Sequence, residues 1–200
     1  MSNLPVADSP IRPGELEFNF RSGRLCLAFA ATVGERWRRG FERLCGPSDL
    51  ARWCQQADLL DEEIPVTPSD LTSARELREA IYRQAKRIID GGAPSRHDED
   101  LVNDAASHPD LVPVLRHGTM TRVAPRGAPA HAVLSTVARD AIALFASVDP
   151  GRLRECASPE CGLLFVDSSR PGHRRWCSSG ACGGQARAAA FRRRSQTRAG

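Results

Sequence analysis

The chain has 200 residues, of which 41% are hydrophobic and 26% are charged. This composition suits a folded protein with one sizeable core and a small appended module, and it excludes disorder of the whole chain. No apolar run approaches the roughly 20 residues that a membrane-spanning helix needs, and the N-terminus lacks the pattern of a secretory signal, so we expect a cytoplasmic protein.

The net charge of +4 is divided unevenly along the chain. Residues 1–150 hold 18 Lys and Arg against 21 Asp and Glu, whereas residues 151–200 hold 10 against 3. The C-terminal quarter is therefore strongly basic, and the two parts are expected to have different roles.

The first part of the chain predicts a flexible arm followed by short helices. Residues 1–20 are rich in proline and show little periodicity, so they are expected to form the arm. Residues 24–33 are apolar on nearly every side, as in a short buried helix. Ser48 follows a proline and is expected to cap a helix that runs through residues 50–59.

The next hundred residues complete a mainly helical domain. The longest helix is predicted at residues 70–90, ended by a pair of glycines, and a shorter one at residues 95–107. Residues 111–125 alternate around Gly118 and predict a small β hairpin. A strong helix is predicted at residues 129–148, with these side chains expected in the core: Val133, Val137, Ile142, Leu144 and Phe145.

Four of the seven cysteines form two equally spaced pairs: Cys156, Cys161, Cys177 and Cys182. The pattern is Cys-x4-Cys, fifteen residues, and Cys-x4-Cys, which suits a tetrahedral Zn²⁺ site with two short knuckles. Four thiolates leave no open coordination position, so one structural zinc is expected. The alternative is four ordinary buried or disulfide-bonded cysteines. The remaining three, at positions 26, 45 and 54, are expected to be core thiols.

The residues between and after the cysteine pairs predict the rest of a small module with its own core. Residues 163–166 favour a strand and residues 173–176 a return strand, which together would form a hairpin between the pairs. A helix is expected to begin near Cys182. One face of that helix, which carries Gly184, Ala188, Phe191 and Ser195, is expected to close on Trp176.

The module also carries arginines suited to phosphate contacts. We expect the nucleic-acid-binding residues to be Arg170, Arg174, Arg175, Arg187, Arg192, Arg193 and Arg194. The alternatives are a solvated basic tail and a surface for protein docking. The fold class is thus a mainly α domain at residues 21–150 with a small β hairpin, followed by a zinc-bound module of knuckle, hairpin and helix at residues 151–200.

The C-terminal pattern resembles the CGNR zinc-finger family in RLRECASPECGLLFVDSSR, in RRWCSSGACG and in the basic helix that follows. The tetrapeptide that gives the family its name reads Cys182-Gly183-Gly184-Gln185 here, so the Asn-Arg pair is absent. The preceding part is similar to the ABATE domain in GRLCLAFAATVG, DLARWCQQADL and ARELREAIYR. Within the first of these motifs, Ala28 and Ala31 stand where the family commonly has Asp and Asn.

The resemblance implies a stress-responsive transcriptional regulator with a DNA-binding C-terminal zinc finger. DNA is therefore the expected partner, and a homodimer and an effector at the N-terminal domain are left open. The alternative is an RNA-binding or protein-interaction module with a purely structural zinc. An enzyme is not expected, because the sequence has no Gly-rich phosphate loop, nucleophile elbow or His/Asp/Glu metal cluster.

Overall fold

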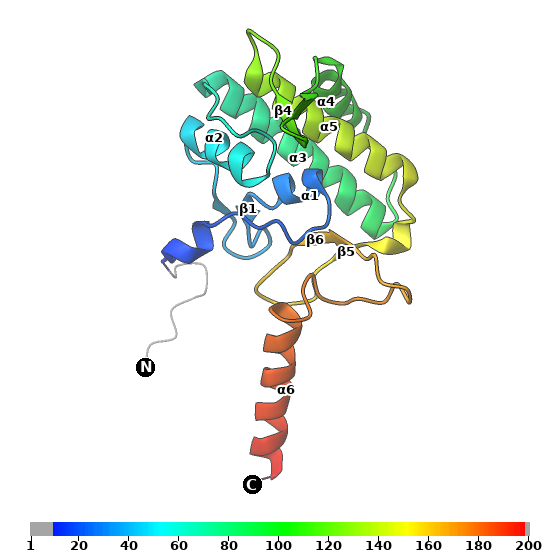
Figure 1. Ribbon diagram of the computed structural model, residues 1–200. Coiled ribbons are helices and arrows are strands. Elements are labelled where there is room, and N and C mark those ends of the chain that lie inside the picture. Colours follow the sequence, from blue (N-terminus) through cyan, green and yellow to red (C-terminus); the bar gives the residue numbers. More distant parts are fainter. Residues whose placement is uncertain (1–9, 199–200) are drawn as a thin grey trace.

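The computed structural model describes residues 10–198, without the side chains of Arg193 and residues 196–198. A body of helices lies above a small two-stranded sheet, and the C-terminal helix α6 (Cys182–Arg198) projects away from both (Figure 1). No helix in the described part of the chain is long and apolar enough to cross a membrane.

The core of the body is formed around the short helix α1 (Leu25–Ala30), which contacts both α3 (Pro68–Asp90) and α5 (Pro129–Ser147). Every residue of α1 after Leu25 is buried. A helix that is apolar on all sides can be stable only when other elements cover it all round, and the two long helices do so here. The predicted buried helix is confirmed.

The N-terminal ends of α2 (Pro47–Gln56) and α3 are fixed by side chains that accept hydrogen bonds from free backbone N–H groups. At α2 the carboxylate of Asp49 accepts the N–H of Gly46 at 2.9 Å, so Gly46, and not Ser48 as expected, is the cap residue. An acidic group in the first turn is also favoured by the helix dipole. At α3 the hydroxyl of Thr67 accepts the N–H of Asp70 at 3.2 Å.

The other predicted elements of the body are present. Gly91 ends α3 with a φ of 69°, a left-handed conformation that glycine adopts without steric cost. Helix α4 (Arg96–Ser107) follows, and β3 (Val112–Arg116) pairs antiparallel with β4 (Thr119–Val123). Both strands are edge strands, so the missing N–H of Pro113 is tolerated.

Helix α5 buries only part of its expected core set. Val133, Val137 and Leu144 are buried, whereas Ile142 is 39% exposed and Phe145 is half-buried. Both of the latter line an open groove shared with α3 and α4, because the side of α5 that carries them extends past the contact between the helices. The prediction for Ile142 was wrong.

Two further strand pairs connect the body to the C-terminal module. β1 (Val33–Gly34) pairs with β2 (Phe41–Glu42), and β5 (Leu153–Glu155) pairs with β6 (Leu164–Val166). The 3-10 helix η3 (Pro150–Arg152) joins α5 to β5. This link is so short that β5 is held against α3, where Lys86 and Glu155 form an ion pair at 2.7 Å.

The core of its own that the C-terminal module was expected to have is limited to the residues around the cysteines. Leu153 and Leu164 are 2% and 3% exposed and belong to the same core as the helices. The N–H of Val166 also donates to the carbonyl of Ser22 at 3.2 Å. The hairpin β5–β6 is therefore part of the floor of the helical body, and a smaller second cluster surrounds the cysteines.

The described part of the N-terminal arm is anchored to the body. Residues 10–12 lead into the 3-10 helix η2 (Pro13–Leu16), in which the carboxylate of Glu15 forms an ion pair with Arg39. The backbone carbonyl of Glu15 accepts a hydrogen bond from Arg43 at 2.9 Å. The arm consequently covers the β1–β2 pair. Residues 1–9 of the arm expected at residues 1–20 lie outside the described residues.

Candidate metal centre

The four paired cysteines meet at one point beneath the body. The Sγ atoms of Cys156, Cys161, Cys177 and Cys182 all lie within 4.8 Å of one another. The Cys177 Sγ is 3.7 Å from that of Cys161 and 3.6 Å from that of Cys182. Four Zn–S bonds of about 2.3 Å in a tetrahedron place the sulfurs about 3.8 Å apart, which the two measured distances match and which the others approach to within about 1 Å.

The first pair of cysteines forms the turn of the hairpin β5–β6. Cys156 directly follows β5, and its N–H donates to the carbonyl of Leu163 at 2.9 Å. The N–H of Cys161 donates to the carbonyl of Ser158 at 3.1 Å, which tightens the loop between the two ligands. The zinc knuckle therefore closes the hairpin that reaches into the main core.

The prediction of a hairpin between the two cysteine pairs was wrong. The strand at residues 164–166 is present, but its partner is residues 153–155, upstream of the first cysteine, and residues 173–176 are not a strand. Eight residues separate β5 from β6 and only six separate β6 from residue 173, so closeness along the chain does not decide the pairing. Pairing with the upstream segment buries Leu153.

The second pair lies at the beginning of α6. Cys182 is the first residue of the helix, as the sequence predicted. The N–H of Gly183 donates to the carbonyl of Ser178 at 2.9 Å. A Cβ at Gly183 would lie 3.3 Å from that carbonyl oxygen, so glycine allows this close turn. The N–H of Cys177 points at the Cys156 Sγ, 3.4 Å away.

The sulfurs influence one another's protonation strongly. A hydrogen bond with Cys161 lowers the pKa of Cys156 to about 2, and the same bond raises the pKa of Cys161 to about 12. The pKa of Cys177 is also raised, first by its hydrogen bond with Cys156. Cys161 and Cys177 thus retain their protons when nothing else compensates the charge on Cys156, and a divalent cation is the group that allows the sulfurs to ionise together.

A buried carboxylate braces the loop between β6 and the second pair. Asp167 is 1% exposed and accepts the N–H groups of Ser169 at 3.0 Å and Arg174 at 2.7 Å. Burial opposes its ionisation, but hydrogen bonds from Ser169 and Arg174 hold the pKa of Asp167 at about 2. Sequence analysis missed this role, although an Asp directly after an apolar strand and before two serines is typical of such a loop.

The arginines expected to contact nucleic acid fall into different environments. Arg170, Arg175, Arg192 and Arg194 are exposed, and Arg187 donates to the carbonyl of Ser179 at 2.9 Å. The half-buried Arg174 donates to the carbonyl of Cys177 at 2.6 Å and lies over the ring of Phe165. Its guanidinium is therefore partly engaged in bracing the zinc site. The side chain of Arg193 lies outside what the structure describes.

The helix face that was expected to close on the knuckle is open instead. Phe191 is 66% exposed, and α6 extends away from the body beyond its first turn (Figure 1). The pattern of a helix predicts which residues share a face, but not whether another element covers that face. Of the other cysteines, Cys26 and Cys54 are buried as expected, whereas Cys45 is exposed because it lies in the loop before α2.

These features define a zinc-finger protein: four cysteines hold one structural zinc, a hairpin links that site to a helical domain, and a helix starts at the last ligand. Residues 152–195 match the CGNR zinc finger. Residues 23–148 match the ABATE family, described as "Putative stress-induced transcription regulator", and the chain belongs to this family. A search of curated proteins finds no match to the chain.

Proposed function

We propose that the protein is a DNA-binding transcriptional regulator that contacts DNA through its zinc finger and α6. The main support is α6 itself, which extends from the zinc site clear of the body (Figure 1). Its 17 residues include five arginines and no acidic residue. At 1.5 Å per residue the helix is about 25 Å long, and its diameter fits the major groove of DNA.

The phosphate contacts in this proposal come from exposed arginines without ion pairs among the described residues. Arg170, Arg175, Arg192 and Arg194 meet that condition. We add Arg187 and Arg193 because they lie on the same helix, and we give Arg174 a smaller share because it braces Cys177. The zinc site with its four thiolates carries about −2, which leaves the module with a charge of roughly +5. That charge favours a polyanion.

The test is the salt dependence of binding to duplex DNA. Each phosphate contact should contribute about −0.9 to the slope of log affinity against log salt, and we expect three to five effective contacts. Replacing Arg192, Arg193 and Arg194 together with Ala should flatten the slope by about two to three while the zinc content stays unchanged. The matched control replaces Arg116, Arg122 and Arg126, which lie in or beside the β3–β4 hairpin.

If the α6 variant binds duplex DNA as tightly as the wild type and with the same slope, the helix is a solvated tail and the proposal fails. Tighter binding to structured RNA than to duplex DNA at equal salt would favour the RNA-binding alternative. Free α6 arginines and an exposed Phe191 are compatible with either nucleic acid, so the comparison must be made on the same protein preparation.

The proposal has three further parts. The protein acts in the reducing cytoplasm, because the zinc site and three other cysteines need free thiols. It regulates by binding and not by catalysis, since both matched families are non-enzymatic by description. A homodimer and an effector complete the scheme. Sedimentation with and without DNA tests the dimer.

A further inference from the structure

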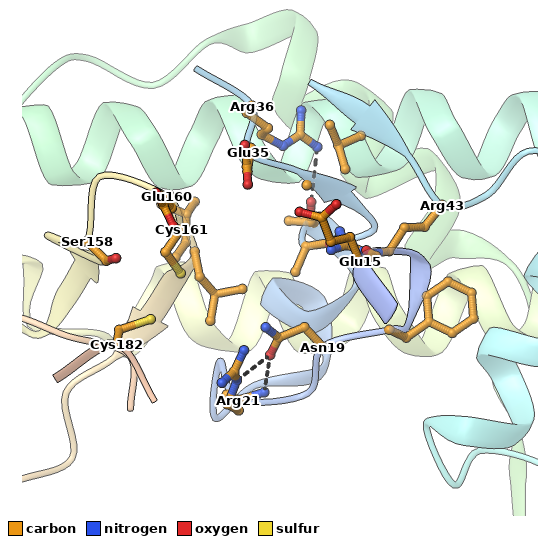
Figure 2. Close-up of a pocket in the computed structure, with 18 of the residues that line it drawn as sticks. Glu15, Asn19, Arg21, Glu35, Arg36, Arg43, Ser158, Glu160, Cys161 and Cys182 are labelled. Carbon is orange, nitrogen blue, oxygen red and sulfur yellow. Dashed lines mark hydrogen bonds between the residues drawn. The ribbon is translucent and has the colours of Figure 1, made fainter. Parts of the chain in front are cut away.

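A cavity of about 510 Å³ lies between the helical body and the zinc finger. Typical small-molecule sites measure roughly 300–1,000 Å³, so its volume is that of a ligand site. The arm, α1 and the β1–β2 pair form one side, and the zinc knuckle and the first turn of α6 form the other (Figure 2). We call it the interdomain cavity; its polar wall includes Asn19, Arg21, Arg36, Arg43, Cys161 and Cys182.

The two more buried carboxylates in the wall are already paired. Glu15 and Glu35 both form ion pairs with Arg39, which is not part of the wall. Glu15 also accepts the N–H of Arg12 at 2.8 Å, and Arg38 lies 3.6 Å from Glu35. The wall also contains Glu17 and Glu160, but both are exposed to solvent. The acceptors deeper in the cavity are therefore occupied.

Two arginines in the wall have donor capacity to spare. Arg43 forms no ion pair among the described residues; its guanidinium donates to the backbone carbonyls of Glu15 and Ala31, each at 2.9 Å. Burial lowers its pKa, which means that its charge is incompletely compensated. Arg36 pairs with Glu79 at 2.6 Å, but its Nε is buried without any hydrogen-bond partner. Such unsatisfied donors favour an anionic ligand.

The remainder of the wall is apolar. Phe18, Phe20, Ala31 and Val33 line the interdomain cavity and are not fully buried; Phe20 is 39% exposed. A ligand that places an anionic group at the arginines can therefore lay a hydrocarbon or aromatic body against these side chains, which would add hydrophobic binding energy.

We propose that the interdomain cavity binds a small organic carboxylate with an apolar body. Its carboxylate lies at Arg36 and Arg43, and its body lies against Phe20 and Val33. Figure 2 shows Arg43 on the side of the pocket opposite Cys161 and Cys182. This binding does not depend on nucleic acid, whereas its regulatory meaning rests on the proposed function.

The cavity connects the ligand to the zinc site physically. Cys161 and Cys182 are zinc ligands and also form part of the wall, as does Gln185 in the first turn of α6. A ligand in the cavity consequently contacts the base of the helix that we propose binds DNA. A bound ligand can shift α6 from one position to another only if the ligand binds the protein more tightly when α6 is in the second position.

The test uses the fluorescence of 8-anilino-1-naphthalenesulfonate, an aromatic anion, bound to the zinc-loaded full chain. We expect one probe per chain, displaced by phenylacetate and not by phenethylamine, which has the same ring but a positive charge. Arg43→Gln should weaken phenylacetate binding by about tenfold or more. The matched control is Arg126→Gln, an exposed arginine outside the cavity, which should bind phenylacetate as the wild type does.

A second variant leaves the charges intact. Gly14 lines the cavity, and a Cβ there would meet no atom within 4 Å, so Gly14→Phe should occupy part of the space without disturbing the fold. This variant should also bind 8-anilino-1-naphthalenesulfonate more weakly than the wild type. Equal displacement by phenethylamine, or wild-type affinity in both cavity variants, would overturn the proposal. Because no nucleic acid is present, either result is independent of whether the protein binds DNA.

Discussion

Replacing Leu153 with Ala should destabilise the helical body, although this residue belongs to the zinc finger. Leu153 is 2% exposed and lies on β5, which packs against α3. Replacing a buried Leu with Ala costs about 2–5 kcal/mol of unfolding free energy. We take a loss of about 3 kcal/mol in unfolding free energy, and a decrease of that free energy by roughly 2 kcal/mol per M urea. The urea concentration at the midpoint of unfolding should then fall by about 1.5 M.

The fluorescence of Trp53 can report this change, because its side chain is fully buried in the helical core. Trp37 and Trp176 would be replaced with Phe so that Trp53 alone emits. Leu115→Ala is the matched control, since Leu115 is 78% exposed and its loss should change the unfolding free energy by less than about 0.5 kcal/mol. An unchanged Trp53 transition in the Leu153 variant would refute a shared core.

Three other predictions follow from the zinc site and its surroundings. Metal analysis of protein purified without added zinc should give one zinc per chain. The Cys161→Ser variant should lose that zinc and unfold, as reported by Trp53, at a lower urea concentration. A folded wild type without zinc would contradict this prediction. The pKa of Asp167 is lowered from 3.8 to about 2, so the stability it contributes is present above about pH 4 and lost as the pH falls through about 2. Asp167→Asn should therefore flatten the decline in melting temperature between those values, and an equally steep decline would remove the argument. Finally, a Cβ at Gly184 would meet only the carbonyl of Ser179 at 4.0 Å, and Gln185 is exposed. The double variant Gly184→Asn with Gln185→Arg should therefore fold normally and bind DNA more tightly. Unchanged affinity for DNA at low salt would count against a role for that pair.

Local patterns in the sequence were enough to predict most helices and the zinc ligands. The bounds of a helix depend on neighbouring residues, such as Gly91 at the end of α3. The zinc ligands were identified by the spacing of four cysteines within 27 residues. The cap of α2 was missed because Ser48 is a residue type that commonly caps helices, whereas the actual cap, Gly46, has no side chain and is held by the carboxylate of Asp49.

The arrangement of elements in space could not be predicted in the same way. Two short segments could pair with residues 164–166, and the upstream one forms the strand because it also buries Leu153. The interdomain cavity joins Arg36 and Arg43 to cysteines more than a hundred residues later in the chain. No spacing rule connects such residues, since only the packing of β5 and β6 beneath α1 and α3 brings them together.

The shared core also has a consequence for biosynthesis. Leu153 and Leu164 leave the ribosome after all five helices of the body, so those helices emerge with part of their core still missing. The hairpin that supplies these residues is closed by a zinc knuckle, and the last zinc ligand, Cys182, is made after every helix of the body. The supply of zinc to the newly made protein therefore affects the yield of the entire molecule, including parts that never touch the metal.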